Sequence, residues 1–386
     1  MLQTIVFVPL FLLVYHYILY PVLVVVLARL LGGSRRALQS GEGDDHDLPR
    51  VTFLVAAYNE SLVIDEKIRN TLDLDYPGDL LEVIVVADGS DDGTERIVEA
   101  YADQSVISLH QPERRGKTAA LNRGVEKASG EIIVFSDANN EFSKSAIREL
   151  VKHFRDEKVG GVCGIKQIKQ ASERESSTGD SIYWLYESRI KQAESDIATV
   201  TIADGEIFAI RKDLFEKIDE SVINDDAEIS YDLIKKGFRI VYERAACSRE
   251  LASEKLVDDF HVKVRMVAGG FQTVALHASA VFNLTSWYSF SFISHKLLRW
   301  LAPIFMILVL AGSLVGWQEP VFQLLLGAQV LFYGLACLGW YGLQRENMSR
   351  VLYVPFYFVA MNMAAFMGLL RYFSSSQSVN WRKAAR

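Results

Sequence analysis

The chain has 386 residues, and its formal net charge of −7 argues against non-specific binding to nucleic acid. Its three cysteines, Cys163, Cys247 and Cys337, lie far apart and form no CxxC pair. This spacing suggests neither a disulfide framework nor a zinc site, and it fits a reduced domain that faces the cytoplasm.

Residues 5–31 form an apolar run that is long enough to cross a bilayer. A signal peptide is the alternative, but it would have a shorter apolar core, a basic residue before it and small residues after it. The sequence therefore predicts a retained transmembrane helix within residues 1–32. Arg29, Arg35 and Arg36 lie at or after the end of the run, so we expect the next domain on the cytoplasmic side.

A polar linker at residues 33–49 is followed by a mixed segment, residues 50–255, in which short apolar runs alternate with amphipathic ones. Strands are expected at residues 51–58, 81–90, 106–110 and 131–137, and helices at 60–72, 94–102 and 117–128. This alternation is typical of βαβ units, so we expect an α/β domain with a Rossmann-like, mostly parallel sheet.

Polar clusters follow several of the predicted strands, where ligands bind in parallel sheets. The stretch FSDANN (135–140) offers the carboxylate of Asp137 and, two residues on, the amide oxygen of Asn139. Both are hard oxygen ligands of the kind that a phosphate-bound divalent cation prefers. The alternative for this hexapeptide alone is an ordinary Asp-Asn turn at the end of a strand.

Three further pieces support a nucleotide site. Asp88 and Glu60 follow two other strands, and a carboxylate there could accept hydrogen bonds from a base or a ribose. Lys117 stands in the first turn of a predicted helix, where both the ammonium and the helix N-terminus favour phosphate. Each piece alone is weak, and their common order along the chain is the stronger signal.

The stretches AAYNE, VADGSDDGT, GKTAALN and SDANN resemble, in order, the motifs of family 2 glycosyltransferases, which use nucleotide sugars and have a GT-A fold. The flanking apolar segments are similar to the branch with the hyaluronan, chitin, cellulose and poly-N-acetylglucosamine synthases. The resemblance implies that Asp137 binds Mg²⁺ or Mn²⁺ on a UDP diphosphate. Asn139 departs from the second acid of the family's DxD signature, so Asn139→Asp is expected to tighten metal binding. The nucleotide-binding residues that it implies are Ala57, Tyr58, Asn59, Glu60, Asp88, Lys117, Asp137 and Arg265.

The stretch NDDAEI (224–229) matches the family pattern TEDxDL. The resemblance places Asp226 on the catalytic base, which takes the proton of the acceptor hydroxyl, and Asp225 on the acid before it. An acidic first turn that stabilises a helix N-terminus is the structural alternative.

The remaining family signatures are less complete. Asp204 and Gly205 match the segment that lines the sugar and acceptor pocket, and YWLYE (183–187) is equally consistent with acceptor contact and with ordinary packing. In the family's QxxRW signature only Arg265 is kept, because Val262 and Met266 replace the glutamine and the tryptophan. His261 and Gln272 are candidate substitutes, with Gln272 assigned to the pocket.

Residues 256–298 combine apolar, basic and aromatic residues, which favours amphipathic helices in the membrane interface, with a soluble core helix as the alternative. Residues 299–374 contain about three further transmembrane helices, and a basic tail, residues 375–386, follows. We expect residues 50–298 inside, the loop 316–320 outside, and the loop near Arg345 and Arg350 inside. Three full spans put the tail outside, although its basic residues argue for the opposite side.

The apolar segments predict a multi-pass protein of the plasma (inner) membrane, and the resemblance implies that it transfers a sugar from a UDP-sugar to a growing polysaccharide, with inversion. One alternative is the transfer of a single sugar to a lipid-linked acceptor, and the missing tryptophan leaves processivity open. An alternative of another class is an inactive membrane scaffold or transporter. A homo-oligomer and a secretion partner are also left open.

Overall fold

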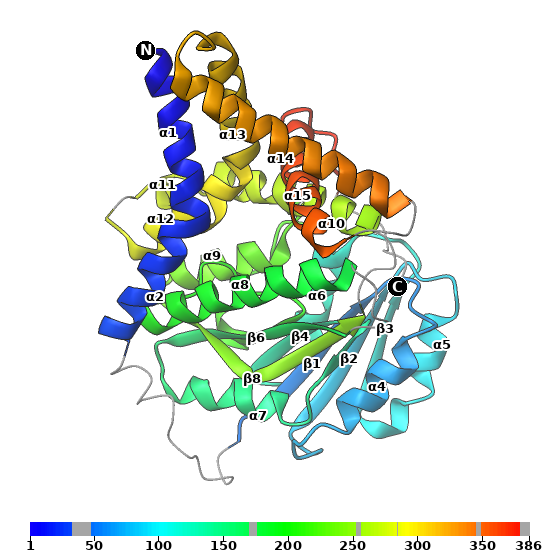
Figure 1. Ribbon diagram of the computed structural model, residues 1–386. Coiled ribbons are helices and arrows are strands. Elements are labelled where there is room, and N and C mark those ends of the chain that lie inside the picture. Colours follow the sequence, from blue (N-terminus) through cyan, green and yellow to red (C-terminus); the bar gives the residue numbers. More distant parts are fainter. Residues whose placement is uncertain (33–47, 170–175, 252–255, 284, 345–348, 379–386) are drawn as a thin grey trace.

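The computed structural model describes residues 1–32, 48–169, 176–251, 256–283, 285–344 and 349–378. Most of the predicted linker, the loop that contains Arg345 and the end of the basic tail lie outside these residues. Figure 1 shows the sheet domain on one side of the molecule and the long apolar helices on the other.

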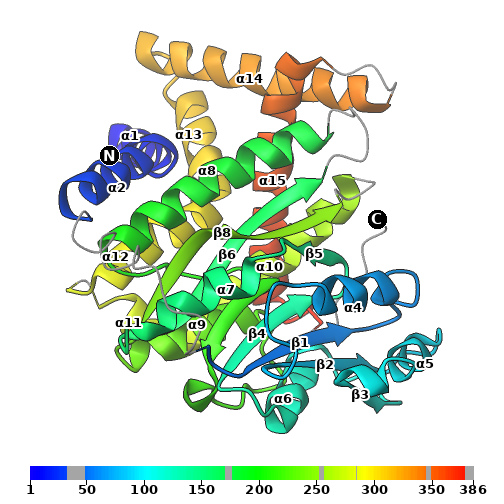
Figure 2. The same ribbon diagram turned by 90° about the horizontal axis from the view of Figure 1, so that it is seen from below.

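One eight-stranded sheet forms the centre of the domain, in the order β3-β2-β1-β4-β7-β6-β8-β5. Strands β3, β2, β1, β4, β6 and β8 share one direction, and β7 and β5 run against their neighbours. The sheet is therefore mixed but mostly parallel, as predicted (Figure 2). The strands are β1 Val51–Ala57, β2 Leu81–Asp88, β3 Val106–Gln111, β4 Ile132–Asp137, β5 Asn140–Phe142, β6 Val159–Lys169, β7 Ile207–Arg211 and β8 Arg239–Leu251.

The four strands predicted from the sequence are β1 to β4, and the three helices between them are also confirmed, with shorter bounds. They are α4 Ile64–Leu72, α5 Thr94–Glu99 and α6 Lys117–Lys127. Helix α4 begins four residues later than predicted because the preceding residues form a turn. In that turn Asn59 has a φ of 53°, and the backbone N–H of Glu60 donates to Oγ1 of Thr94 at 2.9 Å.

Apolar residues cover both faces of the sheet, which is why the parallel strands read as continuous apolar runs. On one face Phe53 belongs to a core that α4, α5 and α7 (Ala146–Val151) help to close. On the other face Leu54 and Phe135 pack with α6 and α9 (Asp225–Lys235). The side chains of β1 thus alternate between two cores, and every residue of this strand is buried.

Four helical segments among the described residues are long and apolar enough to cross a membrane, namely Leu2–Leu31, Trp287–Val315, Pro320–Gln344 and Val351–Phe373. The first comprises α1 Leu2–Val14, a π-turn (Tyr15–Leu19) and α2 Tyr20–Leu31, and the second comprises α12 Trp287–Phe292, a π-turn (Ile293–Leu297) and α13 Leu298–Val315. The others are α14 Pro320–Gln344 and α15 Arg350–Phe373. The predicted boundary at residue 298 lies inside a continuous helix, since no proline interrupts the segment before Pro303.

Helix α10 (Leu256–Leu276) lies where the amphipathic segment was predicted, and it packs along α15. Val267 and Phe271 of α10 share a core with Leu369 of α15. The short helix α11 (Ala278–Val281) leads from α10 towards α12. The position of α10 relative to a membrane stays a prediction.

A buried charged cluster joins the sheet domain to the second apolar helix. Helix α8 (Ser176–Ile197) supplies Glu187 and Glu194, and the π-turn and the start of α13 supply His295, Lys296 and Arg299. His295 is fully buried and lies 2.9 Å from Glu194 and 3.2 Å from Glu187, while Arg299 lies 2.7 Å from Glu187. We call these five residues the α8 joint.

Candidate active site

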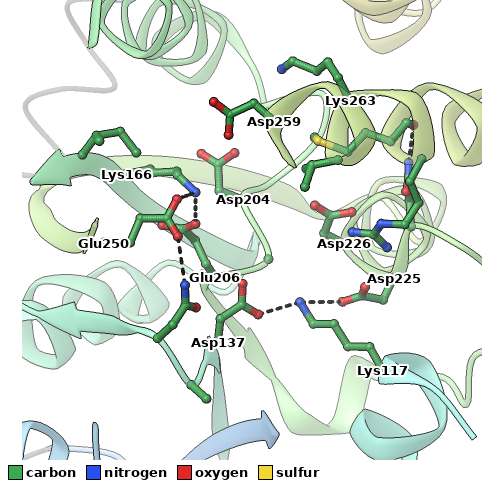
Figure 3. Close-up of a pocket in the computed structure, with 18 of the residues that line it drawn as sticks. Lys117, Asp137, Lys166, Asp204, Glu206, Asp225, Asp226, Glu250, Asp259 and Lys263 are labelled. Atoms are coloured by element: carbon green, nitrogen blue, oxygen red, sulfur yellow. Dashed lines mark hydrogen bonds and ion pairs between the residues drawn. The ribbon is translucent and has the colours of Figure 1, made fainter. Parts of the chain in front are cut away.

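A cavity of about 380 Å³ opens where β1 and β4 end, between the sheet and helices α10 and α15. Figure 3 shows that acidic and basic side chains from distant parts of the chain converge on it. Its charged lining residues are Glu60, Lys117, Asp137, Lys166, Asp204, Glu206, Asp225, Asp226, Glu250, Asp259, Lys263 and Arg265. Glu60 and Asp137, which were predicted at strand ends, and Lys117, which was predicted at a helix start, therefore line one cavity.

Lys117 bridges two of the predicted acidic positions. Its Nζ lies 2.8 Å from Oδ1 of Asp137 and 3.8 Å from Oδ2 of Asp225 (Figure 3). The two carboxylates hold the pKa of Lys117 above its usual value in spite of its burial, so the ammonium stays charged. The resulting arrangement has one fixed cation between the end of β4 and the start of α9.

Asp226 follows Asp225 in the first turn of α9 and faces the same cavity. Burial raises the pKa of Asp226 to about 6, and the neighbouring charge of Asp225 adds to this effect while Lys117 opposes it. Gly205 lies against Asp226, since a Cβ on this glycine would stand 3.0 Å from Cβ of Asp226. A carboxylate whose pKa lies near neutrality is suited to accept a proton.

Asp137 ends β4 and Asn139 precedes β5, and both line the cavity. Nδ2 of Asn139 is 3.5 Å from Oε2 of Glu250. A carboxylate and an amide oxygen are suitable donors for Mg²⁺ or Mn²⁺. No group of three or more His, Cys, Asp and Glu side chains suited to a metal occurs among the described residues.

A second charged group was not foreseen from the sequence. Lys166 of β6 pairs with Glu206, at 2.5 Å, and with Glu250 of β8, and its Nζ lies 5.1 Å from the centre of the Trp184 ring. Burial raises the pKa of Glu206 to about 7, with Lys166 opposing this shift. These residues are far apart in the sequence and belong to no shared motif, so no sequence signal linked them.

Asp88 does not line the cavity. It is fully buried, and its carboxylate accepts from the backbone N–H groups of Arg115, at 3.0 Å, and Gly116, at 2.7 Å, and from Arg123, at 2.9 Å. The carboxylate thus holds the loop immediately before Lys117. Direct contact between Asp88 and a nucleotide stays a prediction, and its position favours an indirect role.

Three other predicted nucleotide residues also lie outside the lining. Ala57 is buried at the end of β1. The Tyr58 ring stacks under the guanidinium of Arg114 at 3.5 Å, and Nδ2 of Asn59 donates to Asp91 at 2.8 Å. These contacts shape the rim beside the strand ends.

The predicted pocket residues divide in the same way. Asp204 and Gly205 line the cavity, with Lys191 behind Asp204 at 2.6 Å. Gln272 lies outside it and clamps the preceding loop, because its amide accepts from the N–H of Ile223 and donates to the carbonyl of Ser221, both at 2.9 Å.

The altered family signature lies at the cavity wall. Arg265 and Met266 line it, as does Val262, and Arg265 donates to the carbonyl of Ile223 at 3.3 Å. The stretch YWLYE contributes Tyr183 and Trp184, and the apolar helix α15 contributes Tyr357 and Met361. The cavity therefore reaches from the strand ends to a candidate membrane span.

Residues 52–219 match the family model described as Glycosyl transferase family 2. The poly-beta-1,6-N-acetyl-D-glucosamine synthase of Staphylococcus aureus (strain COL) is 30% identical over 233 residues, which are 59% of this chain and 56% of that protein. The probable glycosyltransferase YdaM of Bacillus subtilis (strain 168) is 30% identical over 251 residues, 62% of this chain and 59% of that one. The chain thus spans little more than half the length of these curated relatives.

Among solved structures, the mannosyltransferase PcManGT from Pyrobaculum calidifontis, in complex with GDP-Man and Mn²⁺, has a TM-score of 0.71. The match covers 98% of this chain and 100% of that one at 24% sequence identity. This likeness shows the fold, and it confirms the predicted GT-A architecture. The chain therefore has a GT-A fold, and its residues 52–219 match the family 2 glycosyltransferase model.

Proposed function

We propose that the protein is a membrane-integrated, inverting glycosyltransferase that transfers a sugar from a UDP-sugar to a growing polysaccharide. The observation that carries the proposal is the convergence of Lys117, Asp137, Asp225 and Asp226 on one cavity whose far wall belongs to α15. The similarity to a poly-beta-1,6-N-acetyl-D-glucosamine synthase supports the polysaccharide product.

In this proposal Asp137 and Asn139 hold Mg²⁺ or Mn²⁺, and the Mn²⁺ in PcManGT supports the choice of metal. The cation supplies a Lewis acid that screens the charge of the diphosphate as it leaves. Lys117 and Arg265 bind the diphosphate oxygens, since both cations line the cavity. Glu60 lines the same cavity and is a further proposed nucleotide-binding residue.

Asp226 is the proposed base. It removes the proton from the acceptor hydroxyl while the oxygen attacks the anomeric carbon on the face opposite the leaving nucleoside diphosphate. Attack from that face inverts the configuration of the sugar. Asp225 keeps the ammonium of Lys117 beside the leaving group, and it also keeps the pKa of Asp226 high.

One observation favours the second candidate, transfer of a single sugar to a lipid-linked acceptor. Tyr357 and Met361 of α15 line the cavity, so an acceptor attached to a lipid could reach it from the membrane side. The site at the strand ends would serve either acceptor, and product length separates the two.

The test uses the purified full chain with a panel of UDP- and GDP-sugars, with nucleotide release and product mass as readouts. Long chains beside untouched acceptor, with acceptor limiting, support processive synthesis. Products that are one sugar longer at every donor concentration would refute processive synthesis and support transfer to a lipid-linked acceptor. Absence of transfer with every donor, with Asp226→Asn as the inactive control, would instead favour the scaffold or transporter.

The proposal also places the catalytic domain in the cytoplasm, where nucleotide sugars occur, and the basic residues after the first span support this side. Single cysteines placed in the loop 316–320 and in the domain, in a cysteine-free background, test the orientation. Labelling of the loop from outside and of the domain only from inside is the expected pattern. Labelling of the tail from inside would show that one C-terminal segment is not a full span.

A further inference from the structure

A lysine lies buried beneath the loop that carries the proposed metal ligands. Lys67 of α4 is only 1% exposed, although lysine is rarely buried without a partner. Its Nζ donates to the backbone carbonyl of Asn140 at 2.9 Å and to the side-chain Oδ1 of the same residue at 2.6 Å. The ammonium also lies 5.0 Å and 4.5 Å from the ring centres of Phe53 and Phe142.

Asn140 is the centre of a buried hydrogen-bond network. Its Oδ1 accepts from Lys67 and, at 2.9 Å, from the hydroxyl of Ser136, and its Nδ2 donates at 2.9 Å to the carbonyl of Glu206 and to Oγ of Ser248. One side chain therefore connects α4, the end of β4, the segment before β7 and β8. Both hydrogens and the oxygen of this amide are used, so its orientation is fixed.

This network determines where the proposed metal ligands lie. Asp137 stands between Ser136 and Asn140, and Asn139 immediately precedes Asn140, so Asp137 and Asn139 are held at both ends of a tight turn. The carbonyl of Glu206 brings in the segment that also carries Asp204 and Gly205 of the pocket. A displacement of Asn140 would thus reach both sides of the cavity.

Burying the ammonium group of Lys67 costs free energy, which would not be needed if this residue only filled space. Burial lowers the pKa of Lys67 to about 7, while the charges of Asp137, Glu206 and Glu141 oppose this shift. A methionine or leucine would fill the same space between the two aromatic rings without that cost. The ammonium is distinguished by its two hydrogen bonds to Asn140.

We infer that Lys67, acting through Asn140, is a positioning residue that sets the geometry of the metal-binding turn Asp137–Asn139. The inference rests on the proposed metal role of Asp137. Partners that orient metal ligands from behind typically contribute 10- to 100-fold to metal affinity. We therefore expect Lys67→Met to weaken Mn²⁺ binding by about tenfold or more.

The experiment measures the dissociation constant of Mn²⁺ for the detergent-solubilised full chain in the presence of saturating UDP. The free-ion signal in electron paramagnetic resonance gives this constant without turnover. Asp137→Ala sets the scale for loss of a ligand. Lys67→Gln, which keeps an NH₂ group that can donate hydrogen bonds, is expected to lie between the wild type and Lys67→Met, and it also serves if Lys67→Met does not fold.

Lys212→Met is the matched control. The ammonium of Lys212 also donates to a backbone carbonyl, that of Ala128, but it lies near Ile132, at the other end of β4 from Asp137. Both methionine variants should lower the melting temperature, whereas only Lys67→Met should weaken Mn²⁺ binding. In a double-mutant cycle, Lys67→Met and Asn140→Ala should be non-additive in Mn²⁺ affinity.

The outcomes separate the inference from the function. Wild-type Mn²⁺ affinity in Lys67→Met and in Lys67→Gln, together with loss of binding in Asp137→Ala, would overturn the inference and leave the proposed function. Equal weakening in Lys212→Met would also overturn it, because the effect would be global. Unchanged binding in Asp137→Ala would remove the metal role of Asp137, and with it both proposals for this turn.

Discussion

The pH dependence of turnover should report the ionisation of Asp226. The proposed base acts only as a carboxylate, and burial raises its pKa to about 6. Turnover at saturating donor should therefore rise with pH through an acidic limb near that value. An aspartate with an ordinary pKa of 3.8 would leave turnover flat over the same range.

The size of the effect follows from the fraction of Asp226 that is ionised. With a pKa of about 6, about nine tenths of the carboxyl groups are ionised at pH 7 and about one tenth at pH 5. Turnover should thus fall by about tenfold between these pH values, if proton removal contributes to the rate-limiting step.

Two substitutions should move the limb in opposite directions. Asp225→Asn removes the neighbouring negative charge that raises the pKa of Asp226, so the limb should move to lower pH. Lys117→Met removes the cation that opposes this shift, so the limb should move to higher pH. Because Lys117 is also a proposed diphosphate ligand, turnover must be measured at saturating donor.

The assay is nucleotide release by the full chain between pH 4.5 and 8 (a range chosen about the pKa near 6), with folding checked at each pH. A limb that stays in place in both variants would show that it reports another group, and the argument for Asp226 as the base would fail. A shift to higher pH in Asp225→Asn would contradict the electrostatic reasoning directly.

Three further predictions concern the cavity and the core. Turnover should disappear in chelator and return with Mn²⁺ or Mg²⁺, and full turnover in chelator would contradict a metal role for Asp137. Gly205→Ala places a methyl group 3.0 Å from Cβ of Asp226, so kcat should fall while the melting temperature changes little, and an unchanged kcat would show that Asp226 adjusts freely. Gly124→Ala places a methyl group 2.2 Å from Cδ1 of buried Leu54, so denaturant unfolding should show a loss of about 1–3 kcal/mol, and unchanged stability would show that Leu54 repacks.

Much of the sheet could be predicted from the sequence because β1, β2 and β4 form largely apolar runs that alternate with helices. The second half of the sheet was harder to predict, because β7 lies between β4 and β6 and runs antiparallel to both. Only pairing between residues far apart in the sequence determines this position. Local patterns carry no information about such an insertion.

The site residues also fall into those that local motifs predict and those that only the folded structure brings together. Asp137, Lys117 and Asp226 stand in recognisable motifs, and all three line one cavity. Asp88 also stands at the end of a strand, but its carboxylate accepts hydrogen bonds from the next loop and does not line the cavity. The sequence pattern, a carboxylate at a strand end, is the same for Asp88 and Asp137, so it does not distinguish their positions. The ion pairs of Lys166 were found only in the structure, because its partners Glu206 and Glu250 lie far apart in the sequence, one before β7 and one in β8.

Gln272 shows a further limit. Its place beyond the altered signature suggested a contact with sugar, whereas its amide closes on the loop before Asp225. A polar side chain that fixes a loop and one that binds a ligand have the same composition, and only the partners distinguish them.

The α8 joint has a consequence for how this protein can be divided and for how it can diverge. A soluble version without the apolar helices would keep Glu187 but lose Lys296 and Arg299, and it would leave Glu194 without its contact to His295. Removing one partner of a buried ion pair costs about 3–5 kcal/mol. Catalysis should therefore be studied in detergent or lipid with the helices attached. For the same reason, a chimaera that takes α13 from a relative should fold well only when it takes α8 from the same relative.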